Sequence, residues 1–154
     1  MPDSQPENTR NGTIDRKLKL LENKLNELRS WKIESFYAFQ SNTQLRYAVE
    51  RVLQICVEIV IDIGMRIVAL EKQIPNTNAS EMLEILEKLG IIPHEHPYHK
   101  MVQFRNLIVH RYEYIDAEIL YGIIKKNLPD FEVYADQIRN YQSKRNNSSY
   151  ELIT

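Results

Sequence analysis

The apolar residues near the start of the chain recur at steps of four and three, the spacing of one face of an α-helix. This series is Ile14, Leu18, Leu21, Leu25 and Leu28. It predicts a long first helix over residues 14–40 with a narrow apolar stripe that needs a partner helix. Helical spacing continues through most of the chain, without a β pattern of useful length, a repeat or a low-complexity tract. The sequence therefore predicts an all-α fold, an up-and-down helical bundle.

The second predicted helix, residues 44–72, is apolar on most of its circumference and is expected at the centre of the bundle. Polar residues interrupt it at every fourth position, which excludes a membrane span and favours a solvated edge with ion pairs. These residues are Arg46, Glu50, Gln54, Glu58, Asp62 and Arg66. Further helices are expected over residues 81–89, from about Pro97, and from about Asp116, with Pro129 kinking or splitting the last one.

Length and composition favour one domain. The chain has 154 residues, of which 43 % are apolar. We expect a disordered leader over residues 1–13, a helical domain over 14–145 and a flexible tail over 146–154. Twenty basic residues nearly balance 21 acidic ones, so an anionic ligand must be held locally. The only cysteine, Cys56, is expected to be a buried hydrophobe, and the lack of disulfides indicates a cytoplasmic location.

The stretch "FRNLIVHRYEY" at residues 104–114 places Arg105 near the middle of an apolar helical arc. A guanidinium in such surroundings is unfavourable unless an anion meets it. In one interpretation the anion is Glu50 or Asp62 of the second helix, and His110 is an ordinary polar residue. In the other, the anion is a phosphate and His110 can exchange a proton near neutral pH. Asn106, one turn before His110, would then hydrogen-bond or orient the imidazole.

The same helix is too apolar to be an edge that faces water. We therefore expect it to pack on its own core with one side and on another chain with the other, most simply in a symmetric homodimer.

Two motifs resemble those of a known family. The first runs Arg105, Asn106, three apolar residues, His110, Arg111 and Tyr112, and is similar to the RxxxxHxY signature of HEPN-domain proteins. "FRNLIVHRY" resembles its version in the HepT toxins of type VII-like toxin–antitoxin modules. The second, "LRYAVERVLQICVEIVIDIG" at residues 45–64, is similar to that family's second-helix signature. The resemblance covers residues 14–140.

The resemblance implies a helical homodimer that cleaves RNA as a metal-independent endoribonuclease, with no cofactor. His110 would remove the proton of a ribose 2′-hydroxyl or protonate the leaving oxygen. Arg105 would stabilise the negative charge that develops on the phosphorus centre, and Asn106 would position a phosphate or the imidazole. Arg111 and Lys100 would supply a small RNA-binding patch.

The resemblance also implies a partner, a minimal nucleotidyltransferase (MntA-like) antitoxin that transfers AMP to Tyr112. Without the family, Tyr112 is equally well explained as an aromatic residue of an interface. A second class of function remains open, in which the chain is a catalytically inactive helical partner that regulates the nucleotidyltransferase.

A third class is metal chemistry, prompted by "HEHPYH" at residues 94–99, where His94, His96 and His99 lie close to Glu95. The segment is broken by proline and lacks the i, i+4 spacing of helical zinc motifs, so the sequence predicts no metal.

Overall fold

The structure, a computed structural model, describes residues 6–72, 74, 76–110 and 115–153. Side chains are described over 12–72, 74, 76–108 and 115–148. Within the described backbone there are helices and no strand, which confirms the all-α prediction. The helices are α1 (Pro6–Ser30), α2 (Phe36–Ser41), α3 (Thr43–Glu71), α4 (Ala79–Lys88), α5 (Tyr98–His110), α6 (Ala117–Gly122), the π-helical turn η1 (Ile123–Asn127) and α7 (Leu128–Ile153).

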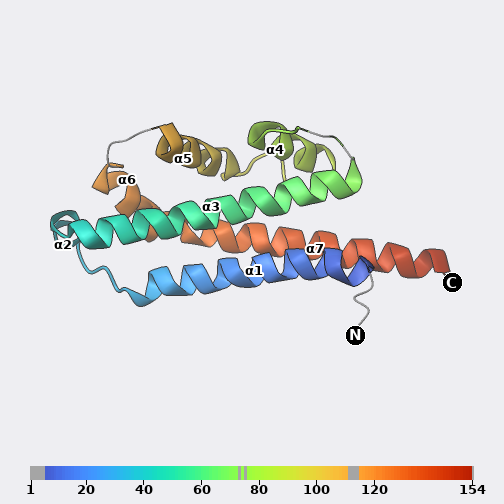
Figure 1. Cartoon of the computed structure of the whole chain (residues 1–154), viewed down its shortest axis with the longest axis horizontal. Coiled ribbons are helices and arrows are strands. Elements are labelled where there is room, and N and C mark those ends of the chain that lie inside the picture. The colour runs from blue at the N-terminus through green and yellow to red at the C-terminus, as the bar shows by residue number, and fades with distance from the viewer. Residues whose placement is uncertain (1–5, 73, 75, 111–114, 154) are drawn as a thin grey trace.

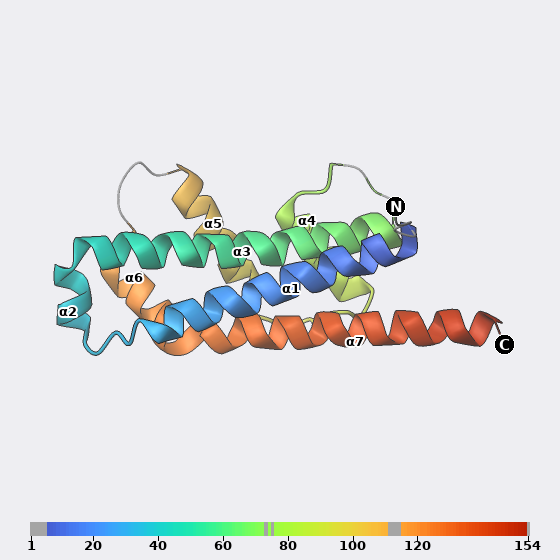
Figure 2. The ribbon, with the colours of Figure 1, turned by 60° about the horizontal axis from the view of Figure 1, so that its bottom comes forward.

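Three long helices, α1, α3 and α7, run along the length of the molecule, with α1 antiparallel to the other two (Figure 1). The shorter helices α4 and α5 pack on α3, on the side away from α1, and they lead the chain back along it. At one end α2 and α6 close the bundle, and at the other end α1 begins and α7 ends (Figure 2). Among the described helices, none combines the length and apolar character needed to cross a membrane.

The predicted apolar stripe of the first helix is confirmed, because each of its five members is at most 4 % exposed. The stripe packs on α3 and α7. As predicted, α3 is the central helix, and its buried residues include Val49, Leu53, Cys56, Val60 and Ile63. Removing one such large aliphatic side chain from water contributes roughly 1.5–3 kcal/mol. Burial of α3 on several sides therefore contributes strongly to stability.

The predicted end of the first helix is wrong. It ends at Ser30 rather than near residue 40, and Lys32 follows with a φ of 45°, a left-handed conformation that an α-helix cannot contain. The chain restarts as the short helix α2, where the Ser35 hydroxyl accepts a hydrogen bond from the Ala38 N–H (3.1 Å). A serine N-cap of this kind satisfies one of the free backbone donors at a helix start.

Side chains cap the starts of the other helices too. Asn42 accepts a hydrogen bond from the Leu45 N–H (3.0 Å) at the start of α3. Asn78 and Glu81 form a reciprocal capping box at the start of α4. The Asp116 side chain accepts a hydrogen bond from the Glu118 N–H (3.0 Å) at the start of α6, so the helix predicted from about Asp116 is confirmed.

The irregularity expected at Pro129 is a π-helical turn, η1, that joins α6 to α7. Proline has no N–H to donate to the carbonyl four residues earlier, so a regular α-helical ladder cannot pass this point. Lys125 of the turn donates to the Ile33 carbonyl (2.7 Å), and its ammonium lies 5.4 Å from the centroid of the Tyr121 ring. These contacts tie the turn to the connection between α1 and α2.

Both ends of the chain contain more helix than expected. The described part of α1 begins at Pro6, within the predicted leader, and α7 continues to Ile153, through most of the predicted tail. Glu71 at the end of α3 accepts hydrogen bonds from Tyr141 and Arg145, which holds the far half of α7 against the bundle. The domain boundaries at residues 14 and 145 stay predictions.

Candidate functional site

Helix α5 carries the motif that the sequence singled out. It packs on α3 and α4 through a face on which Tyr98, Met101 and Val102 are buried. The Tyr98 hydroxyl donates to the Gln137 side chain of α7 (2.6 Å), and its ring meets the Tyr134 ring edge to face. Because one end of α5 is fixed in this way, the positions of later residues on the helix follow from the helical repeat.

Arg105 lies one turn after Met101 and Val102, on the same inward side of α5. The residue is half-buried, and its Nε is buried without a hydrogen-bond partner in the part of the chain that the structure describes. Among the described residues, no carboxylate forms an ion pair with Arg105. The guanidinium is thus partly desolvated without a described counter-charge, which is unfavourable unless a ligand or a further group supplies one.

The internal acids considered as partners for Arg105 are engaged elsewhere. Asp62 forms an ion pair with Lys17 of α1 (3.4 Å). The Glu50 carboxyl accepts a hydrogen bond from the Ile115 backbone. Its pKa is raised, because the effect of burial is larger than the opposite effect of that bond. The interpretation in which Glu50 or Asp62 neutralises Arg105 is therefore wrong within the described residues.

Of the remaining polar members of the motif, Asn106 alone has a described side chain. Asn106 is exposed, and so is Gln103, so the polar strip of α5 faces outward. His110 is the last residue of α5, one turn after Asn106, and its side chain lies outside the described residues. Arg111 and Tyr112, predicted to bind RNA and to accept AMP, also lie outside them.

Lys100 is separated from Arg105. It is exposed, and it lines an open groove of about 430 Å³ between α5, η1 and α7, whose walls are mainly apolar. Phe104 and Leu107 of α5 and Phe131 of α7 form part of these walls, whereas Arg105 does not. Five residues correspond to about 140° around a helix, so the two cations point to different sides of α5. The structure does not bring Lys100 to the predicted site.

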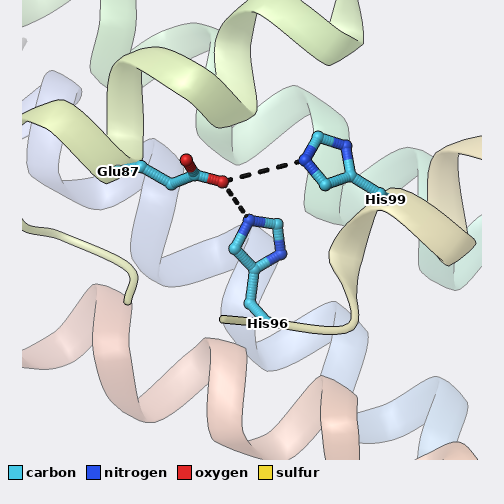
Figure 3. A group of neighbouring side chains, drawn as sticks. All are labelled: Glu87, His96 and His99. Atoms are coloured by element: carbon cyan, nitrogen blue, oxygen red, sulfur yellow. Dashed lines mark hydrogen bonds and ion pairs between the residues drawn. The ribbon is translucent and has the colours of Figure 1, made fainter. Parts of the chain in front are cut away.

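A second group of functional side chains surrounds Glu87, near the end of α4. Its Oε1 lies 2.5 Å from His96 Nε2 and 3.7 Å from His99 Nε2 (Figure 3). Its Oε2 lies 3.8 Å from His94 Nδ1. The hydrogen bond from His96 is the main reason that the pKa of Glu87 is lowered. All three histidines of "HEHPYH" therefore meet one carboxylate.

The sequence associated these histidines with Glu95, but Glu95 is exposed and Glu87 takes its place. Glu87 lies nine residues before His96, in helix α4, whereas His96 lies in the connection that follows it. No spacing rule connects the two, so sequence reasoning missed this residue. The only available signal was that Gly90 and Pro93 force a turn that returns the chain toward the end of α4.

Solved structures with the same fold include three informative ones. The HEPN toxin of Shewanella oneidensis, tri-AMPylated and in complex with an MNT antitoxin, is 24 % identical over 82 % of this chain and 96 % of that chain, with a TM-score of 0.73. A chain of a toxin–antitoxin complex with AMP-PNP is 23 % identical over 82 % of this chain and 97 % of that chain, with a TM-score of 0.73. YutE from Bacillus subtilis, a cytosolic protein of unknown function, is 17 % identical over 88 % of this chain and 92 % of that chain, with a TM-score of 0.74.

No curated protein matches the sequence significantly. The family model described as Ribonuclease HepT-like matches residues 21–138, which is more than half of the chain and includes both predicted signatures. The chain belongs to the HepT-like family.

Proposed function

We propose that this protein is the toxin of a toxin–antitoxin pair and that it cleaves RNA without a metal ion. The observation that carries the proposal is Arg105, a half-buried cation whose Nε has no described hydrogen-bond partner, in a helix that ends at His110. A phosphodiester would supply the negative charge that the described protein does not, and the planar guanidinium binds phosphate oxygens in pairs. The family membership adds independent support.

The proposed reaction is transesterification within the RNA. His110 takes the proton of a 2′-hydroxyl, the oxygen attacks the adjacent phosphorus, and the bond to the 5′-oxygen breaks. A second His110, from the other protomer, protonates the leaving 5′-oxygen. Arg105 stabilises the negative charge on the phosphorane oxygens, and Asn106 orients the imidazole or a phosphate. The products are a 2′,3′-cyclic phosphate and a 5′-hydroxyl, so DNA is not a substrate.

The proposed active form is a symmetric homodimer in which the two α5 helices face a shared cleft. Arg105 is half-buried and Asn106 is exposed, so the motif lies at the edge of its own bundle, where a second protomer could face it. A second copy would place a second set of motif residues opposite the first. Arg111 beside the cleft would bind further phosphates, whereas Lys100, on the apolar groove, would contribute only to a longer RNA.

The proposed partner is a minimal nucleotidyltransferase that acts as the antitoxin. The Shewanella oneidensis toxin with this fold occurs tri-AMPylated and bound to an MNT antitoxin. By analogy, the partner of this chain would transfer AMP to Tyr112. Position 112 is seven residues from Arg105, about 20° away around a continued helix, so the added phosphate would compete with RNA for the guanidinium.

The test is RNA cleavage by the purified full-length protein in EDTA, followed by analysis of the RNA ends. Fragments with 2′,3′-cyclic phosphate ends are expected, and they should vanish with His110→Ala and Arg105→Ala. Arg139→Ala is the matched control, because Arg139 is an exposed arginine of α7 that pairs with Asp136 (3.7 Å). If the unaltered protein leaves RNA intact and still binds the nucleotidyltransferase, the inactive-partner interpretation replaces the nuclease.

A further inference from the structure

The group around Glu87 has the composition and the placement of a metal site. The chain contains four histidines, and three of them lie within 4 Å of this one carboxylate. One oxygen of Glu87 and one nitrogen each of His96 and His99 lie within 4.8 Å of one another (Figure 3). Imidazole nitrogen and carboxylate oxygen are the ligands from which three-residue protein zinc sites are built.

Three separate segments supply these ligands. Glu87 lies in the last turn of α4, His96 in the connection, and His99 in the first turn of α5. The His96 side chain is 1 % exposed, Glu87 is 18 % exposed and His99 is 49 % exposed. The group is therefore anchored on its inner side and open to solvent on its outer side. An ion can reach it without unfolding of the bundle.

We propose that Glu87, His96 and His99 bind one divalent transition-metal ion, most simply Zn²⁺, as a structural clip between α4 and α5. Zinc lies about 2.0–2.2 Å from nitrogen and oxygen ligands, so two ligands of a tetrahedral site are separated by about 3.4 Å. The separation of 3.7 Å between Glu87 and His99 is close to that value. His94, which is 86 % exposed and lies 3.8 Å from the other carboxylate oxygen, is the candidate for a fourth ligand.

Metal binding requires one rearrangement of the described geometry. His96 Nε2 and Glu87 Oε1, 2.5 Å apart, are joined by a hydrogen bond and are too close to be neighbouring ligands. His96 Nδ1 accepts a hydrogen bond from the Tyr98 N–H (3.1 Å), so the proton of the neutral ring is on Nε2. Coordination through Nε2 moves that proton to Nδ1, breaks the bond from Tyr98, and lets the flexible Glu87 side chain turn toward the ion.

The ion would act on stability rather than on RNA cleavage. His99 precedes Arg105 by six residues, about 9 Å along the axis of α5, and lies on another side of the helix. A clip at this point fixes the start of the helix that carries the motif. The proposal stands independently of the nuclease, because it uses none of the residues assigned to cleavage.

The experiment is titration of the metal-free, untagged full-length protein with ZnCl₂, followed by calorimetry and thermal unfolding. Saturable binding of one ion per chain is expected, with a melting temperature raised by about 5–10 °C when free zinc is 100-fold above its dissociation constant. Co²⁺ in place of Zn²⁺ should give the visible absorption of a tetrahedral site. In NMR spectra, the His96 ring proton should move from Nε2 to Nδ1, and the Tyr98 amide resonance should shift.

The informative variants are Glu87→Gln and His99→Ala, since both side chains reach the surface and their loss leaves the core unchanged. Each should weaken zinc binding at least tenfold. The matched controls are Glu95→Gln and His110→Ala, which remove an acid and a histidine of the same chain outside the group and should bind zinc as the unaltered protein does. Binding that is equally tight in all four variants, or no saturable binding at all, would overturn the proposal.

Discussion

Tyr134 of α7 donates a hydrogen bond from its hydroxyl to the backbone carbonyl of Val60 in α3, over 2.9 Å and in the fully buried centre of the bundle. Burial raises the pKa of the Tyr134 hydroxyl far above its usual value, which favours the protonated form that donates this hydrogen bond. The two long helices are thus joined by a polar contact that has no access to water.

Replacement of this tyrosine tests how much the contact contributes. Tyr134→Phe keeps the ring and removes the donor, and we expect a loss of about 1 kcal/mol in the free energy of unfolding. Urea unfolding followed by circular dichroism measures it. Tyr37→Phe is the control, because Tyr37 is 77 % exposed and should change stability by less than about 0.5 kcal/mol. Equal effects of the two substitutions would contradict the prediction.

Gly64 is required by the contact between α3 and α4. A Cβ at this position would lie 2.2 Å from Met82 Sδ and 3.0 Å from its Cγ, and Met82 is fully buried. We therefore expect Gly64→Ala to destabilise the protein by about 1–3 kcal/mol, since the methionine must leave its site. Gly122→Ala has open space around the new methyl group and should be neutral or stabilising by up to about 1 kcal/mol. Thermal unfolding of both variants gives the comparison.

The Cys56 thiol should be unreactive in the folded protein. It is fully buried, and burial raises its pKa to about 12. We expect no alkylation by iodoacetamide at pH 8 in buffer and complete alkylation in denaturant, measured by mass spectrometry.

The same shift in pKa predicts how stability depends on pH. Above about pH 9 the unfolded state releases the thiol proton and the folded state keeps it, so stability falls as pH rises toward 12, by up to about 1.4 kcal/mol per unit. Tyrosines contribute with the same sign. Subtracting the profile of Cys56→Ala isolates the thiol, and identical alkaline slopes for the two proteins would contradict this account.

If Arg105 grips a phosphate in the manner proposed, Arg105→Lys should lower the rate of RNA cleavage on the order of 10²-fold although the charge is kept. A lysine presents a point charge instead of a planar pair of donors. Circular dichroism should show an unchanged fold. The same exchange at Arg139 is the control, and a cleavage rate that survives Arg105→Lys would mean that charge alone is sufficient.

The sequence predicted the helices well because their determinants are local. The stripe from Ile14 to Leu28 acts within one or two turns, so spacing alone located it. The end of the first helix was missed because Lys32 adopts a positive φ that its residue type does not signal. The partners of Asp62 and His96 were missed because they come from other helices, and their contacts depend on tertiary packing.

The π-helical turn before Pro129 sets the rotational phase between α6 and α7. Each residue advances an α-helix by about 100°, and a wider turn absorbs one additional residue with less rotation. The side of α6 that contacts α2 and the side of α7 that contacts α1 are consequently aligned by the five residues of η1. Deleting one of them would rotate α7 about its own axis. Its buried aromatic rings, Phe131 and Tyr134, would then no longer face the core.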